Sequence, residues 1–209
     1  MQVVANMAPM TQDLPTRILE AAARVYAETG FRGTTTRRVA QEAGVNEVTL
    51  FRHFGTKEAL VKAALQRVHQ QSNQFVLGEP QDPGAEIYGW ALTIFRHWFS
   101  ARGMISRVMG DLVEHPEIAP GVCEEPGCEH ARLSAYLTRM RERGLATKDF
   151  HADAAAGLLM GSVFTHAMWR EHFEDATLPP VEVVLREYVR LLLSAIGADA
   201  AVPASVEGA

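Results

Sequence analysis

Residues 34–54 hold the side chains of this sequence whose types and spacing suggest a chemistry. Arg52 is of the residue type that most often reads guanine in the major groove of DNA. Thr35 stands where a short helix would begin, and the free N–H groups at a helix N-terminus bind phosphate. The chemistry indicated is noncovalent recognition of nucleic acid. The side chains that a second short helix would expose for it are Glu47, Val48, Thr49 and Arg52.

Two short helices joined by a glycine turn would position these side chains. The first covers about residues 36–43 and ends at Gly44, because glycine adopts the left-handed conformation of a helix end at little cost. Asn46 can cap the second, residues 47–53. This is a helix-turn-helix, whose second helix fits the major groove. The two helices are expected to cross closely through small apolar contacts. These come from Val39, Ala40, Ala43, Val45, Leu50 and Phe54. Phe51 is also expected mainly in the core, whereas Arg38, Gln41 and Glu42 are expected to face solvent.

The rest of the sequence is helical in pattern. A helix is expected over about 16–28 and another, capped by Thr56, to about residue 73. No alternating strand pattern of useful length occurs, so we predict an all-α fold with an N-terminal three-helix helix-turn-helix domain and a C-terminal helical domain. Further helices are expected over 85–101, 104–114, 123–143, 152–173 and 181–196, with Gly103 as one of the breakers. The expected boundaries are a flexible arm over 1–13, the DNA-binding domain over 14–60, the C-terminal domain over 61–196 and a flexible tail over 197–209.

The distribution of charge agrees with a DNA-binding N-terminal part. The whole chain has a net charge of −5, which by itself argues against nucleic acid. Between residues 14 and 67, however, nine Lys and Arg outnumber five Asp and Glu, so this segment carries +4 and the remaining 155 residues carry −9. A basic N-terminal segment in an otherwise acidic chain suggests that one face binds phosphates and that another face binds a different partner.

Membrane, secretion and disulfide signals are weak. No apolar run approaches the roughly 18 residues that cross a bilayer, and the first residues lack the basic and apolar regions of a signal peptide. We therefore expect a cytoplasmic protein with no membrane partner. Two cysteines are too few for a disulfide framework. The pattern Cys123-x4-Cys128-x-His130 leaves a metal or redox sensor as an alternative, but its spacing matches no common zinc motif, and no metal site is predicted.

Enzymatic function is disfavoured because the sequence contains no nucleophile elbow, phosphate loop or zinc-protease motif. The pairs His151-x-Asp153 and Asp111-x-x-Glu114 are interpreted as capping or solvent-facing groups. No enzyme activity and no cofactor are expected. A helical protein-binding module or ligand carrier that has lost DNA binding is a further alternative.

Three runs of this sequence resemble the N-terminal domain of the TetR/AcrR family of transcriptional regulators. They are GFRGTTTRRVAQEAGV at 30–45, TLFRHF at 49–54 and KEAL at 57–60. Beyond them the chain is similar to the family only in length and helical pattern. The resemblance implies phosphate contacts at the start of the first short helix, base contacts from the recognition helix and its cap, and backbone contacts beyond it. The residues so assigned are Thr35, Thr36, Arg37, Asn46, Glu47, Val48, Thr49, Arg52, His53 and Lys57.

Two positions depart from the pattern of the family. Phe51 stands where tyrosine is usual, which removes one hydrogen bond to phosphate. Val48 stands where glycine or another small residue is usual, and it could either press on a thymine methyl or restrict how deeply the helix enters the groove. The operator therefore cannot be taken from relatives.

The resemblance also implies that the C-terminal helices bind a small molecule that changes the spacing of two DNA-reading heads. Aromatic and methionine side chains can line an adaptable apolar pocket, although each of them could be ordinary core. His97, His166 and Arg170 could orient a polar end of the ligand. The candidate pocket residues are Trp90, Ile94, Phe95, Trp98, Met104, Val108, Met109, Met160, Phe164 and Met168.

A dimer is expected from the resemblance, since the family binds palindromic operators as two-fold dimers. Gly157 and Gly161 are four residues apart and leave a flat strip on one helix. With the apolar final helix this suggests a four-helix dimer interface, while close packing within one subunit is the alternative. The function expected overall is a homodimeric repressor released from its operator by an apolar or aromatic effector, with activation left open.

Overall fold

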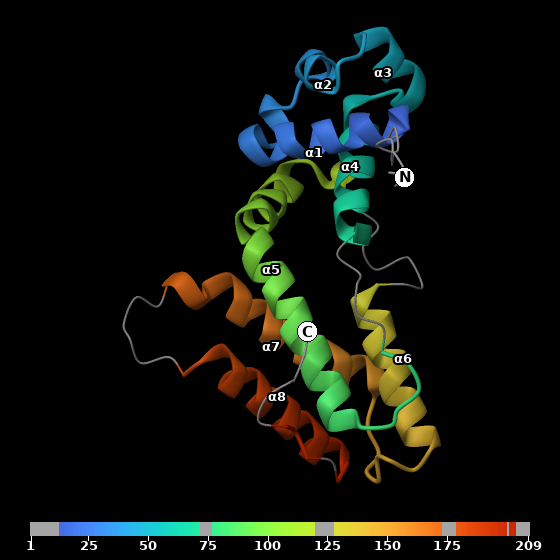
Figure 1. Cartoon of the computed structure of the whole chain (residues 1–209), viewed down its shortest axis with the longest axis vertical. Coiled ribbons are helices and arrows are strands. Elements are labelled where there is room, and N and C mark those ends of the chain that lie inside the picture. The colour runs from blue at the N-terminus through green and yellow to red at the C-terminus, as the bar shows by residue number, and fades with distance from the viewer. Residues whose placement is uncertain (1–12, 72–76, 120–127, 173–178, 200, 204–209) are drawn as a thin grey trace, which may run out of the picture. The chain divides into compact units, whose positions relative to one another are not determined.

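The computed structural model describes residues 13–71, 77–119, 128–172, 179–199 and 201–203. Over these residues the structure is helical and contains no strand, which confirms the predicted all-α class (Figure 1). No helix within the described ranges is long and apolar enough to cross a membrane. The α-helices are α1 (Leu14–Gly33), α2 (Thr36–Ala43), α3 (Glu47–Phe54), α4 (Lys57–Gln71), α5 (Pro83–Glu114), α6 (Glu129–Glu142), α7 (Ala152–Trp169) and α8 (Val181–Ile196), and short 3-10 helices cover Pro116–Ile118 and Arg170–His172.

The chain forms two compact units. The first comprises residues 1–68 with 110–120, and the second comprises residues 69–109 with 121–209. We expected the first domain to end at residue 60. Leu60 and Ala64 lie in the core of the first unit, so this unit includes most of α4. It also includes the last turn of α5, whose Asp111 is hydrogen-bonded to α1.

Side-chain caps and glycines set the limits of the short helices in the first unit. Thr35 Oγ1 accepts from the Arg38 N–H, and α2 ends at Gly44, whose φ of 63° favours glycine. Asn46 Oδ1 then accepts from the Val48 N–H at the start of α3. The predicted start and end of α2 are confirmed. The core of this unit contains Ile18, Ala21, Ala22, Val25, Val39, Ala40, Ala43, Leu50, Leu60 and Ala64, with Val45 and Phe54 packed against it.

Two glycines behave differently from each other in the long helices. Gly30, two residues beyond the predicted end of the first helix, has a φ of 67° and interrupts the helical geometry of α1. Gly103 was expected to separate two helices, and this prediction was wrong because α5 continues through it to Glu114. Gly103 is exposed, and nothing lies within 4 Å of the place of its missing Cβ. Glycine weakens a helix but does not end it unless the backbone leaves helical geometry.

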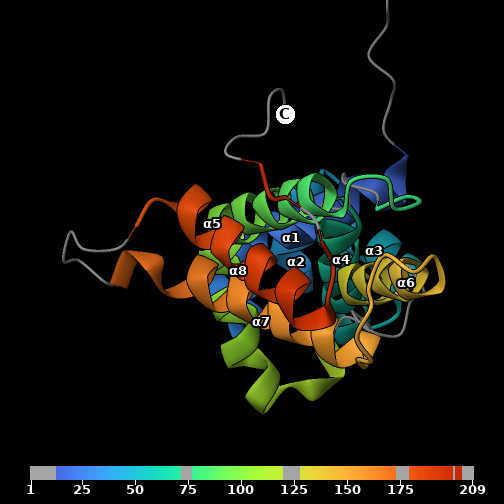
Figure 2. The ribbon, with the colours of Figure 1, turned by 90° about the horizontal axis from the view of Figure 1, so that it is seen from below.

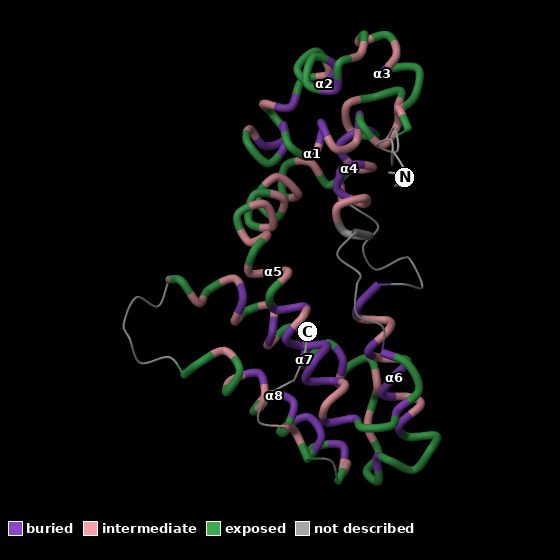
Figure 3. Tube along the Cα trace, in the orientation of Figure 1, coloured by how far each residue is buried: buried purple, intermediate pink, exposed green. Residues whose placement is uncertain are grey.

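The second unit has its own apolar core, formed by the first part of α5 and by α6, α7 and α8. α7 packs against α6 and α8, and α7 and α8 lie side by side in both views (Figures 1 and 2). The burial pattern in Figure 3 alternates along both helices between buried and exposed residues. Large fully buried side chains include Ile87, Tyr88, Trp90, Leu133, Tyr136, Leu137 and Met140.

Two segment ends differ from the expectation. The predicted helix over 123–143 is described from Cys128, which caps α6, and its first part lies outside the described residues. The tail was expected to be flexible from residue 197, but its described part packs on the second unit. The Arg186 side chain donates to the Pro203 carbonyl at 2.9 Å, and a Cβ on Gly84 would lie 2.0 Å from the Ala201 carbonyl oxygen. The tail therefore runs along the start of α5.

Candidate nucleic-acid interface

The ten residues predicted to contact DNA all lie in the first unit, on α2, α3, their caps and the first residue of α4. α2 and α3 pack against each other and are joined by the turn at Gly44 (Figure 1). Val39, Ala40 and Leu50 are buried between these helices and α1, which fixes the rotation of α3 about its own axis. The core therefore decides which side chains α3 presents to solvent.

Polar side chains at the helix starts are engaged within the protein. Thr35 and Asn46 cap α2 and α3 through their side-chain oxygens, at 3.2 and 2.9 Å from the capped N–H groups. The Thr36 hydroxyl donates to the Glu47 carboxylate and thereby ties the first residue of α2 to the first residue of α3. These four side chains hold the two helices in place, and they leave the helix N-termini to offer backbone N–H groups.

The exposed face of α3 carries an apolar pair beside an arginine. Val48 is 73% exposed and Phe51 is 45% exposed. The expectation that Phe51 belongs mainly to the core was wrong. Leu50 and Phe54, four residues apart, face the core, and Phe51 is turned about 100° away from Leu50 on the helix. Arg52 and His53 are exposed next to this pair.

The basic residues of this unit differ in whether they are already paired. Arg38 forms an ion pair with Glu28 at 2.7 Å, and Arg24 pairs with Glu42 at 3.0 Å. Arg38, Gln41 and Glu42 are exposed, as predicted for a solvent-facing side of α2. Over the part of the chain that the structure describes, no acidic side chain pairs with Arg37 or Arg52, both of which are exposed. These two guanidinium groups therefore remain available to a polyanion.

Lys57 begins α4, as expected, but its side chain has a partner. The ammonium lies 4.0 Å from the centre of the Phe31 ring, a cation–π distance. Thr56 caps the same helix, accepting from the Ala59 N–H at 3.1 Å. The Phe31 ring therefore restricts the positions from which the Lys57 ammonium could contact a phosphate.

Asp111 is a structural residue that the sequence did not identify. We expected the Asp111-x-x-Glu114 pair to cap a helix or to face solvent. Instead, one oxygen of the Asp111 carboxylate accepts from the Tyr26 hydroxyl at 2.7 Å and from the Phe31 N–H at 2.9 Å. Glu114 pairs with Arg32 at 2.7 Å. No sequence signal links positions 80 residues apart, so only the fold could show this contact.

In the second unit the structure brings several of the candidate pocket residues together. The Trp98 and Phe164 rings meet edge to face with centroids 5.3 Å apart, which joins α5 to α7. Phe95 lies 5.6 Å from the ring of His166. Trp90, Ile94 and Phe95 are buried core residues, and the Trp90 Nε1–H donates to Glu129 at 2.8 Å. Trp98 and Met160 pack partly buried against the same core, Met104, Val108 and Met168 are half-buried, and Met109 is exposed.

His166 and Arg170, proposed to orient a polar end of a ligand, contact each other. An Arg170 N–H donates to His166 Nε2 at 2.9 Å, so this nitrogen must be unprotonated. Partial burial and the charge of Arg170 lower the pKa of His166 below its ordinary 6.5. Arg170 also donates to the Pro179 carbonyl at 3.1 Å. The pair thus presents a neutral imidazole and a guanidinium beside the aromatic cluster. His97 is half-buried on α5.

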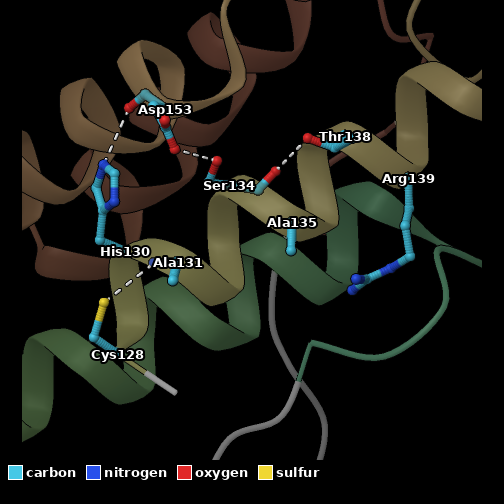
Figure 4. Close-up of a pocket in the computed structure, with 8 residues that line it drawn as sticks. All are labelled: Cys128, His130, Ala131, Ser134, Ala135, Thr138, Arg139 and Asp153. Carbon is cyan, nitrogen blue, oxygen red and sulfur yellow. Dashed lines mark hydrogen bonds between the residues drawn. The ribbon is translucent and has the colours of Figure 1, made fainter. Parts of the chain in front are cut away.

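A groove of 580 Å³ lies elsewhere in the second unit, on the polar side of α6 (Figure 4). Its polar side chains are bonded among themselves: the Ser134 hydroxyl donates to the Asp153 carboxylate at 2.5 Å, and His130 Nε2 lies 3.1 Å from the Asp153 carbonyl oxygen. The groove is not lined by the predicted aromatic pocket residues. It is lined by Cys128, His130, Ala131, Ser134, Ala135, Thr138, Arg139 and Asp153.

The same groove bears on the alternative of a metal or redox sensor. Cys128 Sγ accepts from the Ala131 N–H at 3.4 Å, so the thiol caps α6. The described residues contain no group of three metal-ligating side chains. Cys123, the other cysteine of the pattern, lies outside the described residues. The geometry therefore gives no support to the sensor among the residues described.

α7 and α8 leave apolar side chains exposed. Leu158 on α7 is 68% exposed and Leu191 on α8 is 52% exposed. Gly157 and Gly161 are also exposed, and within the described structure nothing lies within 4 Å of a Cβ on Gly161. The alternative that Gly161 serves close packing within one subunit is not supported, because no neighbour occupies its open side.

Comparisons with known proteins agree with this geometry. The sequence model described as "Bacterial regulatory proteins, tetR family" matches residues 18–64, which extend from α1 into α4. The regulator YvkB of Bacillus subtilis, named as HTH-type, is 27% identical over 185 residues that cover 88% of this chain and 97% of that protein. The helix-turn-helix region of the chain, residues 18–64, is therefore of the TetR type. Over most of its length the chain is similar to a transcriptional regulator of the helix-turn-helix type.

Solved structures of TetR-family regulators have the same fold. A regulator from Mesorhizobium loti aligns with a TM-score of 0.73 at 18% identity and covers 88% of this chain and 97% of that one. FadR from Bacillus subtilis, solved in complex with stearoyl-CoA, aligns with a TM-score of 0.62 at 17% identity over 87% of this chain and 98% of that one. The predicted resemblance to the TetR family and the predicted fold are therefore confirmed, the fold as an N-terminal helix-turn-helix followed by a C-terminal helical domain.

Proposed function

We propose that this protein is a regulator of the TetR type, a homodimeric repressor that acts in the cytoplasm by binding a palindromic operator through α3. The observation that carries the proposal is the exposed face of α3, which projects Arg52 from a segment with a charge of +4. Arginine can donate two hydrogen bonds to guanine in the major groove. Arg37, at the start of α2, adds a second unpaired cation within the described structure. Thr35, Thr36, Asn46 and Glu47 support these contacts by fixing both helix starts.

Dimerisation supplies the second half of the reading surface. The exposed apolar faces of α7 and α8, with Leu158 and Leu191, are the surface that we assign to the subunit interface. Gly161 offers a second helix close approach there, because its open side is unoccupied in the described chain. A two-fold pair would join four helices and present two copies of α3 to two half-sites. This arrangement accounts for apolar side chains that are costly to leave in water.

The effector that we propose is a small apolar or aromatic molecule bound in the second unit. Phe95, Trp98 and Phe164 form an aromatic cluster between α5 and α7, and Met160 adds an adaptable side chain. Arg170 and His166 stand beside the cluster and offer a donor for a polar end of the molecule. FadR, a protein of this fold, was solved in complex with stearoyl-CoA, a ligand that carries a long apolar acyl chain.

Substitution of Arg52 tests the DNA-binding role. The whole chain would first be used to select duplexes from random-sequence DNA, and affinities for the selected duplex would be measured by fluorescence anisotropy. We expect Arg52→Ala to bind about tenfold or more weakly, since a bidentate guanine contact contributes about 1–3 kcal/mol. Arg38→Ala is the matched control, because Arg38 is also exposed but is paired with Glu28; it should change the affinity by less than about threefold. Equal affinity of Arg52→Ala and wild type, or failure to select any sequence, would contradict the proposal.

A further inference from the structure

The exposed side of α3 contains an apolar pair that the proposed contacts of Arg52 do not use. Val48 and Phe51 are three residues apart, so their side chains neighbour each other on one face of the helix. Both are large hydrophobic side chains with high exposure in the described structure. The buried Leu50 and the half-buried Phe54 hold the opposite face against the core, so rotation of α3 cannot hide the pair. The apolar pair is therefore a fixed feature of the surface.

The polar side chains at the start of α3 are largely committed to the protein. Asn46 caps the helix, and the Glu47 carboxylate accepts from the Thr36 hydroxyl. Phe51 has no hydroxyl to donate to a phosphate. Beside Thr49, the first turns of α3 therefore offer an apolar contact next to the guanidinium of Arg52.

The major groove offers one apolar group to such a surface. Thymine presents its C5-methyl there, whereas the other base edges present hydrogen-bond donors and acceptors. We propose that Val48 and Phe51 read thymine methyl groups, so that each half-site of the operator must carry thymine where the pair contacts it. This inference rests on the proposed DNA-binding function. Arg52 on the same helix and Arg37 on α2, which no acidic side chain of the described residues neutralises, favour a polyanion rather than an apolar protein surface as the occupant.

Removal of the methyl groups alone tests the inference. In the duplex selected by the whole chain, every thymine of the half-sites would be replaced by deoxyuridine, which keeps base pairing and the O4 acceptor. Loss of one buried methyl weakens binding by about three- to fourfold, so a symmetric site should bind wild type roughly tenfold more weakly. The affinity would be measured by anisotropy on both duplexes.

Substitutions on the protein side complete the test. Val48→Ala and Phe51→Ala should each bind the thymine duplex more weakly and should each show a smaller loss on the deoxyuridine duplex than wild type does. Val113→Ala is the matched control, because Val113 is an exposed valine of the same unit that lies on α5. Val113→Ala should lose as much affinity on the deoxyuridine duplex as wild type does. Circular dichroism would confirm that all three variants are folded.

The possible failures can be told apart. If no sequence is selected at all, the proposed DNA-binding function fails, and with it the inference. If wild type binds a selected duplex with equal affinity after deoxyuridine replaces thymine, thymine-methyl reading is wrong although DNA binding stands. Unchanged sensitivity of both Val48→Ala and Phe51→Ala to deoxyuridine would also overturn the assignment of the methyl contact to this pair.

Discussion

His166 lies on α7 with Arg170 on one side and the rings of Phe95 and Tyr188 within 6.2 Å. Burial and the neighbouring guanidinium lower the pKa of His166 in the folded protein. In the unfolded chain the imidazole returns to its ordinary pKa of 6.5. As the pH falls below about 6.5, the unfolded chain therefore takes up a proton that the folded protein resists. The contribution of His166 favours folding least in acid.

We predict that His166→Gln removes part of the acid sensitivity of folding. The glutamine oxygen can accept from Arg170 but does not titrate. The free energy of unfolding, measured by urea titration from pH 7.5 to pH 5.5, should fall more steeply for wild type than for the variant. The difference should develop only as the pH drops below about 6.5 and through the lowered pKa of the folded state. Parallel pH profiles of the two proteins would show that His166 is not the group responsible.

Sequence patterns predicted which candidate DNA-contacting side chains are exposed where the helical backbone alone decides their direction. Arg52 and Val48 were expected on the exposed side of the recognition helix, and both are exposed. The expectation for Phe51 was wrong because the position of a residue around the helix, and not its type, decides whether it faces the core. An aromatic residue favours burial, but its position one residue after Leu50 turns it away from the core. The direction in which a side chain points from a helix is set first by its spacing from the buried residues of that helix.

At the scale of elements, the last turn of α5 is fastened to α1. Asp111 accepts two hydrogen bonds, from the side chain of Tyr26 and the backbone of Phe31. Tyr26 is fully buried, and its hydroxyl donates to this carboxylate. α5 begins in the second unit, and its last turn belongs to the first.

We predict that Asp111→Ala lowers the free energy of unfolding by about 2 kcal/mol, because it leaves a buried hydroxyl and a backbone N–H without their charged acceptor. Glu114→Ala is the control on the same turn. Its ion pair with Arg32 is exposed, so the loss should stay below about 1 kcal/mol. Urea unfolding followed by circular dichroism would measure both. Equal losses in the two variants would mean that the Asp111 contacts contribute no more than a surface ion pair.

Element limits were predictable where local chemistry sets them. α2 and α8 have the predicted ends, since threonine and glycine set those of α2, and Pro180 and Gly197 flank α8. The sequence predicts two helices in place of α5, with Gly103 between them, but α5 continues through this glycine. A glycine inside a helix costs about 1 kcal/mol relative to alanine, which the 32-residue helix tolerates. The residue type alone therefore does not show whether a glycine ends a helix.

At the scale of the whole molecule, the chain forms two compact units. The basic segment lies in the first unit, and the aromatic cluster lies in the second. The proposed function assigns DNA binding to the first unit and effector binding to the second. α4 and α5 each have residues in both units.

The central claim is that α3 of a dimer reads a specific palindromic site in DNA. A nuclease footprint of the whole chain on the DNA beside its own gene tests this most directly. We predict one protected interval whose sequence has two-fold symmetry, with half-sites about one helical turn apart, and protection that weakens steeply as salt rises. Protection that shows no sequence preference, or none at low salt and high protein concentration, would contradict the account.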